Sequence, residues 1–340
     1  MKAALLKEPG QPLVIEDLPM PEPLDHEILI RVKACEVARS VVERLKGKTA
    51  MGMKLPLIMG SGGSGEVEKV GKIVKEFKVG DRVCLYAIQA CGHCYNCGLE
   101  RPDLCSNQKF MGYHFDGTFA EYMRVPEANA FRIPPSISYE EGAIFGSSYG
   151  TSFHALKKVG IKKNDLLVIC GLGALGLTAL QVAKSFGAYV VGIDVSESKL
   201  KVAKNVGIDQ AWSASDDLPL KVKTLSGNKQ GADFVYIAIG NSKVMEQAIT
   251  YTRRGGKVVV IADSQDPIRV PPISLIMGVE LIGSTYFLKP ELEDMIKLVT
   301  EGKVNLKPLI NQSFSLDRIM DAISLLDEKG DQLYRVIAKP

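Results

Sequence analysis

The segment "LLVICGLGALGLTALQVAKSFG" constrains the fold more than any other part of the chain. An apolar, strand-like run is followed at once by three closely spaced glycines and then by an amphipathic stretch with helical spacing. Glycines at these intervals permit a tight turn, let the backbone approach a pyrophosphate, and let the helix pack close to the strand. The segment therefore predicts the first unit of a dinucleotide-binding sheet. The expected cofactor-binding turn consists of Gly171, Leu172, Gly173, Ala174, Leu175 and Gly176.

An acidic residue follows at the distance that such a turn requires. The next strand-like run, "AYVVGID", ends at Asp194. An acid roughly twenty residues after the glycine turn accepts hydrogen bonds from the adenosine ribose and repels a 2′-phosphate, so Asp194 favours NAD(H) over NADP(H). Two alternatives stay open: the turn could serve only to pack a helix with Asp194 as its cap, and methyltransferases use a similar turn.

The order of apolar runs divides the 340 residues into two parts, a length that allows two domains. Up to about residue 150, runs such as "HEILIRVKA" and "DRVCLYA" are separated by Gly, Pro and Asp turns, which indicates a mostly β half. From about residue 163, strand-like runs alternate with helical ones, which indicates a parallel sheet. Two amphipathic helices are expected after residue 289, with apolar faces formed by Leu292, Met295, Ile296 and Val299, and by Leu316, Ile319, Met320 and Ile323. The expected fold class is α/β.

Four of the seven cysteines lie close together, in "CGHCYNCGLERPDLC". Their spacing suits a closed tetrahedral zinc site that holds structure and leaves no position for a substrate. An iron–sulfur cluster is the alternative, although ferredoxin-type runs usually carry a different last interval. His93 is expected to be a bystander, and the other cysteines, in apolar runs, are expected to be small buried hydrophobes. The metal ligands would be Cys91, Cys94, Cys97 and Cys105, and the buried cysteines Cys35, Cys84 and Cys170.

Composition excludes several classes of function. A hydrophobic content of 46%, a charged content of 24% and a net charge of +3 describe a globular chain without the basic stripe of a nucleic-acid binder. No uninterrupted apolar run approaches the roughly 18 residues that span a bilayer. The opening "MKAALLKEPG" has too short an apolar run for an export signal. We therefore expect a cytoplasmic protein that acts on a small molecule, with no nucleic-acid and no membrane partner.

Together these features resemble the medium-chain dehydrogenase/reductase family, and within it the zinc alcohol dehydrogenases. The likeness covers nearly the whole chain and includes "MKAALLKEPGQPLVIEDLPMPEP", "VGDRV", "DGTFAEYMRVP" and "RRGGKVVVIA". The resemblance implies a GroES-like catalytic domain at residues 1–152, completed by residues 287–340, with a Rossmann NAD-binding domain at residues 153–286 inserted. It also implies hydride transfer between a nicotinamide and a substrate carbon, and a homodimer or homotetramer formed through the Rossmann domains.

The catalytic zinc of that family has three protein ligands, and this chain matches none of them. The first, a cysteine, aligns with Ala38, and the acid that follows it aligns with Val41. The histidine of a G-H-E signature aligns with Ser61 and its glutamate with Gly62, within "IMGSGGSGEVEKVG". The third ligand aligns with Ser147, to within one residue.

The glycine-rich run at residues 60–65 is therefore interpreted as a vacated metal site. It lacks the Lys-Ser/Thr pair of a phosphate-binding P-loop. Alanine offers no donor atom, and a serine hydroxyl binds zinc far more weakly than thiolate or imidazole, so we expect no catalytic zinc. Cys35 cannot replace the missing cysteine, because an odd offset along a strand reverses the side-chain face.

Other positions of the family's site are kept. Arg39 matches a basic side chain that reaches the cofactor pyrophosphate, and Ser40 matches a hydroxyl that relays a proton from the substrate. A solvated surface charge and an ordinary turn hydroxyl are the alternatives. The loop "MGYHFDG" adds two polar side chains, which a turn packed by an aromatic ring would also explain. The candidate catalytic residues are Ser40, Ser61, Ser147, Tyr113 and His114.

Loss of the zinc argues against simple alcohol oxidation, because a Lewis acid stabilises the developing alkoxide. We expect an NAD(H)-dependent oxidoreductase that reduces an activated C=C or C=O group, whose developing charge hydroxyl and N–H donors can stabilise. A catalytically silent NAD(H)-binding protein with a structural or interaction role fits the same losses. An alcohol dehydrogenase with serine donors in place of zinc is a third alternative. Retention of Arg39, the glycine turn and Asp194 favours the enzyme.

Overall fold

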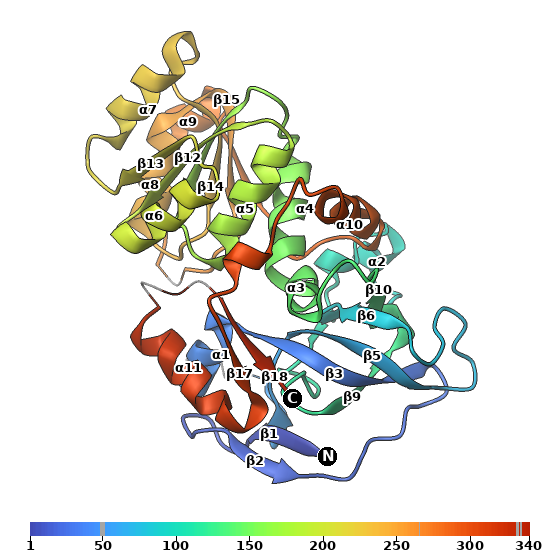
Figure 1. Ribbon diagram of the computed structural model, residues 1–340. Helices are drawn as coiled ribbons and strands as arrows, with labels where there is room; N and C mark the ends of the chain where they lie inside the picture. Colours follow the sequence, from blue (N-terminus) through green and yellow to red (C-terminus); the bar gives the residue numbers. More distant parts are fainter. Residues whose placement is uncertain (48–51, 265, 331–332, 334) are drawn as a thin grey trace. The chain divides into compact units, whose positions relative to one another are not determined.

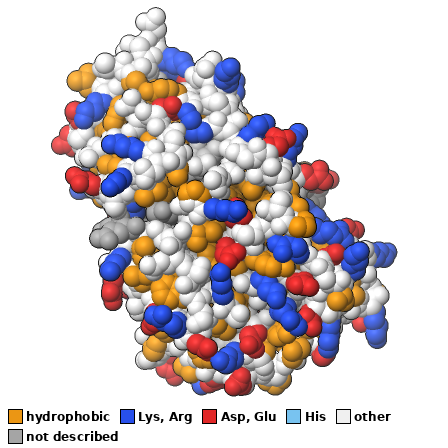
Figure 2. Space-filling model, viewed as in Figure 1, with side chains coloured by type: hydrophobic (Ala, Val, Ile, Leu, Met, Phe, Trp, Pro, Cys, Tyr) orange, Lys and Arg blue, Asp and Glu red, His pale blue; other side chains and the backbone are white. Residues whose placement is uncertain are grey.

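The computed structural model describes residues 1–47, 52–264, 266–330, 333 and 335–340 (Figure 1). The chain forms two compact units, Met1–Ser147 with Ile310–Pro340, and Ser148–Leu309. Within the described ranges, every helix is too short or too polar to serve as a membrane span. Basic and acidic side chains are interspersed on the face drawn in Figure 2, in keeping with the small net charge of +3.

The first unit is built around a long central strand, β3, which pairs with β5, β9 and β18. The main sheet has the order β10-β6-β5-β3-β18-β17, and β9 joins it beside β3. Its strands are β3 (Glu27–Val37), β5 (Gly62–Val70), β6 (Arg82–Leu85), β9 (Tyr122–Pro126), β10 (Ala130–Arg132), β17 (Gln312–Ser315) and β18 (Val336–Lys339). The smaller pairings join β1 (Lys2–Leu6) with β2 (Val14–Asp17) and β4 (Leu57–Ile58), and β7 (Ile88–Gln89) with β8 (Lys109–Phe110).

The two faces of β3 pack against different parts of the unit. Cys35 and Val37 face the main core of this unit, whereas Ala34 packs with Ala143 of helix α3. A capping box starts α3, because Ser138 Oγ accepts the N–H of Glu141 while the Glu141 carboxylate accepts the N–H of Ser138. The helix continues directly into a π-helical turn, Phe145–Tyr149. The helices of this unit are α1 (Arg39–Leu45), α2 (Tyr95–Gly98), α3 (Tyr139–Ile144) and α11 (Ile319–Glu328).

The second unit contains a parallel sheet of the order β13-β12-β11-β14-β15-β16. The order reverses between β11 and β14, and cofactors bind at such a switch point in open α/β sheets. Its strands are β11 (Leu166–Cys170), β12 (Tyr189–Asp194), β13 (Gln210–Ser213), β14 (Ala232–Ile237), β15 (Thr252–Val260) and β16 (Glu280–Gly283). Its helices are α4 (Gly150–Val159), α5 (Ala174–Ser185), α6 (Glu197–Asn205), α7 (Leu218–Ser226), α8 (Ser242–Tyr251), α9 (Pro272–Ile276) and α10 (Leu292–Thr300). The predicted α/β class, with a β-rich part and a Rossmann sheet, is confirmed.

The border between the units differs from the sequence-based one. Residues 148–152 and 287–309, which the sequence assigned to the catalytic domain, lie in the second unit. The reason is a set of contacts within that unit: Tyr149 donates its hydroxyl to Met295 O at 2.9 Å, and His154 Nδ1 lies 2.9 Å from the Glu291 carboxylate. An amphipathic pattern shows which face of a helix is buried, but it does not name the partner.

Candidate functional site

The glycine turn lies between the end of β11 and the start of α5, at the switch point of the sheet. Gly171 has a φ of +93°, which residues with a side chain rarely adopt. A Cβ at Gly176 would lie 1.8 Å from the carbonyl oxygen of Gly171, so only glycine lets the helix approach so closely. A Cβ at Gly173 would meet no atom within 4 Å, so the turn is open there. This geometry fits a pyrophosphate at the helix N-terminus.

Asp194 holds the glycine turn against the end of β12. Its Oδ2 accepts the N–H of Leu172 at 2.7 Å, and its Oδ1 accepts the N–H of Ser196 at 2.9 Å. Each carboxylate oxygen can accept a second hydrogen bond, so these contacts leave capacity for ribose hydroxyls. Asp194 thus caps the turn, and the same geometry is compatible with ribose recognition.

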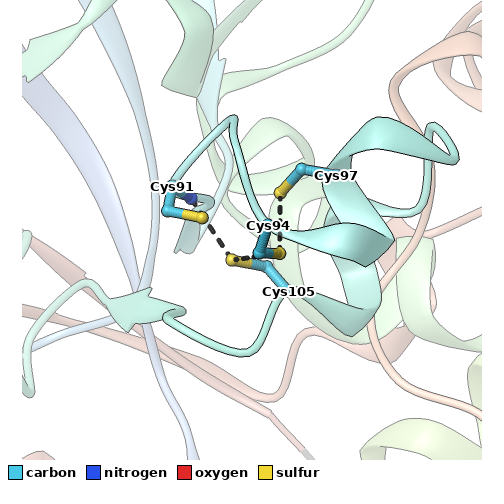
Figure 3. A group of neighbouring side chains, drawn as sticks. All are labelled: Cys91, Cys94, Cys97 and Cys105. Atoms are coloured by element: carbon cyan, nitrogen blue, oxygen red, sulfur yellow. Dashed lines mark hydrogen bonds between the residues drawn. The ribbon is translucent and has the colours of Figure 1, made fainter.

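The sulfur atoms of the four clustered cysteines point toward one another (Figure 3). All lie within 4.8 Å of one another, and the Sγ of Cys94 lies 3.5 Å from that of Cys97 and 3.8 Å from that of Cys105. A tetrahedral zinc with Zn–S distances of about 2.3 Å separates its sulfurs by about 3.8 Å. The N–H groups of Cys91 and Asn107 donate to Cys105 Sγ at 3.3 and 3.4 Å. The cluster fits the predicted structural zinc.

Four protein ligands close this site, so it offers no position to a substrate. Among the described residues, no other group of three or more His, Cys, Asp or Glu side chains is arranged to hold a metal ion. The segment between Cys97 and Cys105 contains a bidentate ion pair, in which Arg101 donates to both carboxylate oxygens of the buried Asp103. His93 is exposed and its Nδ1 lies 2.7 Å from Cys91 O, outside the group of four.

The positions that the resemblance assigns to a catalytic zinc converge only in part. Ala38 immediately precedes α1, Ser61 lies between β4 and β5, and Ser147 lies in the π-helical turn. A Cβ at Gly62 would lie 3.2 Å from Ser147 Oγ, so these two positions are neighbours. It would also lie 2.8 Å from the carbonyl oxygen of Ala143, so position 62 has no room for a glutamate side chain without movement of the backbone.

The glycine-rich run is packed against the loop that contains residues 112–118. A Cβ at Gly60 would lie 2.5 Å from Thr118 Oγ1, and a Cβ at Gly112 would lie 2.5 Å from Gly60 O. Thr118 also donates its N–H to Gly60 O at 3.1 Å and its hydroxyl to Gly62 O at 3.2 Å. Gly60 is therefore explained by close contact with the Thr118 side chain, and Gly112 by close contact with the backbone of Gly60.

Sequence reasoning missed Glu36, which lies beside Ser147. Glu36 is 4% exposed, accepts the Ser147 hydroxyl at Oε2, and accepts Arg335 Nε at Oε1 at 2.9 Å. Its Cβ lies 3.3 Å from the place that a Cβ at Gly62 would take. The signal was present in the sequence, because a single acid within the otherwise apolar run "ACEVA" is costly to bury unless it is paired.

Cys35, next to Glu36, has its side chain on the opposite face of β3. Its Sγ donates to Thr118 O at 2.7 Å within the main core of the unit. Burial raises the pKa of the Cys35 thiol to about 12. Cys35 is thus a buried thiol on the face away from Ser147.

Comparison with known proteins decides the family. The alcohol dehydrogenase GroES-like domain matches residues 24–135, and the zinc-binding dehydrogenase domain matches residues 174–301. An alcohol dehydrogenase of Geobacillus stearothermophilus is 34% identical over 327 residues, 94% of this chain and 96% of the relative. The chain belongs to the medium-chain dehydrogenase/reductase family.

Two further matches agree with this placement in the medium-chain dehydrogenase/reductase family. An NAD-dependent alcohol dehydrogenase of Sulfurisphaera tokodaii is 31% identical, over 96% of each chain. A solved structure of an NAD-dependent alcohol dehydrogenase superposes with a TM-score of 0.90 at 31% identity and covers 100% of both chains. The predicted family and the predicted oxidoreductase class are confirmed.

Two candidate residues of this dehydrogenase, Tyr113 and His114, are held in their turn by ring contacts. Their ring centroids are 4.6 Å apart, and the Arg44 guanidinium lies 5.0 Å from the Tyr113 ring centroid. His114 Nδ1 accepts the N–H of Phe110 at 3.0 Å. Burial, followed by the positive charges of Arg44 and Lys109, lowers the pKa of His114. These contacts support the packing alternative for both residues.

Arg39 and Ser40 open helix α1 of this dehydrogenase and are exposed. Arg39 Nε lies 3.4 Å from the Glu43 carboxylate, and its Nη1 lies 3.3 Å from Leu326 O. The side chain is 54% exposed. These contacts match the surface-charge alternative, although a long exposed side chain retains the reach to contact another anion.

Proposed function

We propose that this dehydrogenase uses NAD(H) to reduce an activated C=C or C=O group and that it works without a catalytic zinc. The arrangement around Gly62 carries the proposal. The nearby Ser147 hydroxyl is donated to a carboxylate, and position 62 has no side chain and no space for one. Zinc prefers thiolate, imidazole and carboxylate ligands. Ala38 and Ser61 provide none of these groups.

The proposed cofactor is supported by the second unit. The open side of the turn at Gly173 and the carboxylate of Asp194 fit the pyrophosphate and the adenosine ribose of NAD(H). The Sulfurisphaera tokodaii relative bears the name of an NAD-dependent alcohol dehydrogenase. Bound NADH would supply the hydride. We also propose that Arg39 moves from Glu43 to the cofactor's phosphates, as the family resemblance implies.

In the proposed reduction, the chain itself must stabilise negative charge on a substrate oxygen. Hydroxyl groups can do this if they donate a hydrogen bond that strengthens as the charge develops. Ser147 is the candidate with a described partner, Glu36, and Ser40 and Ser61 are further hydroxyls on the same unit. The described contacts of Tyr113 and His114 are those of a packed turn, so the proposal assigns them no step.

The test is steady-state NADH consumption by the purified protein with enones, quinones and aldehydes, and NAD⁺ reduction with alcohols. The proposal expects reduction of one of the first three classes, at a rate that does not change when a chelator is added. Turnover of alcohols that survives the chelator would instead support serine donors in place of zinc. NADH binding without any turnover would support the catalytically silent alternative. Alcohol oxidation abolished by the chelator, with the four-cysteine zinc retained, would show that a catalytic metal exists.

We further propose that the protein forms a homodimer or homotetramer through its second unit. Strand β16 is an edge of the parallel sheet, and α9 near it exposes Ile273, Leu275 and Ile276, at 56%, 50% and 75%. Light scattering after size exclusion should give an even multiple of 37.0 kDa. Ile276→Asp should lower that mass. A cytoplasmic location is proposed because none of the seven cysteines is paired in a disulfide.

A further inference from the structure

We propose that Ser147 and Glu36 form a proton-delivery pair for this reduction. Ser147 would be the catalytic residue that contacts the substrate oxygen, and Glu36 a positioning residue that acts through Ser147. The inference rests on the proposed function, because it needs a substrate oxygen that gains a proton.

The pair connects a partly exposed hydroxyl with a buried carboxylate. Ser147 is half-buried, whereas Glu36 is 4% exposed. Ser147 Oγ donates to Oε2 of Glu36. A carboxylate so deeply buried has little direct contact with solvent, so protons would reach it through the hydroxyl beside it.

The two oxygens of Glu36 have different partners. Arg335, which is 1% exposed, donates its Nε to Oε1 at 2.9 Å. Arg335 is itself held by Asn311, because the Arg335 N–H donates to Asn311 Oδ1 at 2.8 Å and the Asn311 N–H donates to Arg335 O at 2.9 Å. The ion pair offsets the cost of burying the charge and fixes the plane of the carboxylate. Oε2 is therefore the oxygen that exchanges a proton with Ser147.

Ser147 has an acceptor for its own proton in either state of Glu36. When Glu36 is ionised, the hydroxyl donates to Oε2. When Glu36 carries a proton on Oε2 and donates it to Ser147 Oγ, the hydroxyl can turn to Ile144 O, which lies 3.3 Å away. Its position in a π-helical turn also sets it apart from the regular helix before it, and such turns occur frequently at functional sites.

The proposed step balances in atoms and electrons. A hydride adds to the substrate carbon, and the π electrons of the reduced bond move to the carbonyl oxygen, directly or through conjugation. Before the hydride transfer, the Glu36 carboxylate takes up one proton from solvent through Ser147. The O–H bond of Ser147 then breaks as its proton passes to the substrate oxygen, Ser147 Oγ takes the proton from Oε2, and Glu36 returns to the carboxylate that pairs with Arg335. With a conjugated C=C substrate the enol formed in this way tautomerises to the carbonyl product. The substrate gains one hydride and one proton.

A purely structural role for Glu36 is the competing explanation, since its pair with Arg335 links β3 to the segment before β18. The chain contains a matched control for that role. Glu140 on α3 pairs with Lys339 on β18 at 2.5 Å, so it also ties a carboxylate to the C-terminal strand. Glu140 has no described contact with Ser147 or Gly62. Glu36→Gln and Glu140→Gln therefore each remove an ion pair to the C-terminal segment, the first a buried pair and the second a partly exposed one, and only the first removes the proton carrier.

The experiment compares Glu36→Gln, Ser147→Ala, their double variant and Glu140→Gln on the substrate that the unmutated protein turns over best. We expect kcat to fall about 100-fold in each of the first two, with no further fall in the double variant because the pair acts as a unit. Glu140→Gln should keep kcat within about twofold. Ser147→Thr and Glu36→Asp should restore part of the rate. The solvent deuterium isotope effect on kcat should change in Glu36→Gln, and the Kd of NADH, from fluorescence titration, should not.

Each outcome decides between named explanations. If the unmutated protein consumes no NADH with any substrate, the proposed function fails and this inference fails with it. If it does turn over and Glu36→Gln or Ser147→Ala keeps its kcat, only the proton-delivery pair is overturned. Losses that multiply in the double variant would also overturn it. Thermal unfolding checks that each variant is folded. If Glu36→Gln is not folded, the kcat of Ser147→Ala is compared with that of Ser147→Thr, because both replacements leave the pair of Glu36 with Arg335 intact. Equal kcat values in these two variants would overturn the proposal.

Discussion

Asp233 at the start of β14 accepts the N–H of Leu166 at the start of β11, with a distance of 2.8 Å from Oδ2 to the nitrogen. The same carboxylate accepts Lys229 Nζ and Arg253 Nε, each at 2.6 Å. Burial by itself raises the pKa of Asp233, but the hydrogen bonds from Leu166, Lys229 and Arg253 outweigh it and hold the pKa below the ordinary value. The Asp233 carboxylate thus links the starts of β11 and β14, the two strands on either side of the switch point.

Asp233→Asn should lower the free energy of unfolding at pH 7 by about 1–3 kcal/mol, a range that allows for the partial exposure of both cations. Because the pKa of Asp233 is lower in the folded than in the unfolded state, its carboxylate stabilises the fold at pH values above the unfolded-state pKa of about 3.9. This stabilisation is lost as the pH falls through the folded-state pKa. Denaturant unfolding between pH 7 and pH 3 should show the difference between the two proteins shrinking below about pH 4. The exposed Asp216→Asn is the control, and a difference that stays constant with pH would contradict the mechanism.

Metal content should be about one zinc per subunit, because the described residues provide one closed four-thiolate group. Replacing Cys94 and Cys97 by serine should remove all of it and lower the thermal midpoint. Inductively coupled plasma spectrometry on the purified protein gives the count. Two zincs per subunit, with one retained after the double replacement, would refute the vacated-site interpretation of Ser61 and Gly62.

NADH should bind more tightly than NADPH, because in the proposed cofactor site the carboxylate of Asp194 would repel a 2′-phosphate. Asp194→Ala should weaken NADH binding about tenfold and reduce the preference, since both the ribose hydrogen bonds and the charge repulsion are lost. Fluorescence titration of both cofactors measures this. Asp209→Ala is the matched control, because Asp209 also accepts a strand N–H, from Val190 at 2.7 Å, but follows α6. Equal affinities of the unmutated protein for both cofactors would refute the assignment.

The glycine turn allows a contrast between binding and folding. Gly173→Ala should leave the thermal midpoint almost unchanged, because the φ of Gly173 is −79° and the new Cβ would meet no atom within 4 Å. The same replacement should weaken NADH binding about tenfold or more, because the new methyl group occupies the open side of the turn. Gly176→Ala should instead destabilise the fold by about 1–3 kcal/mol, because its Cβ would lie 1.8 Å from Gly171 O. Thermal unfolding with and without NADH separates the two effects. Equal effects of both replacements on stability would contradict the proposed division.

Local motifs were readable from the sequence, whereas long-range pairs were not. The glycine turn and the four cysteines each lie within one short segment, so their spacing alone predicts the geometry that the structure shows. Glu36 and Arg335 are 299 positions apart, and no local pattern joins them. The acid was visible as an anomaly in an apolar strand, but its partner and its contact with Ser147 depend on how β3, α3 and the C-terminal segment pack. For the same reason, the amphipathic pattern of α10 did not reveal that the backbone carbonyl of Met295 accepts the Tyr149 hydroxyl.

The division of the first unit has a consequence for synthesis on the ribosome. The second unit is one uninterrupted stretch, Ser148–Leu309, whereas the first needs Ile310–Pro340 to complete its sheet through β18 and to place Arg335 against Glu36. Until that segment has left the exit tunnel, β3 lacks its β18 neighbour at residues 35–37 and the Glu36 carboxylate lacks its counter-ion. The part of the chain that is made first is therefore finished last, and a nascent chain stalled before residue 310 should present an open strand edge to chaperones.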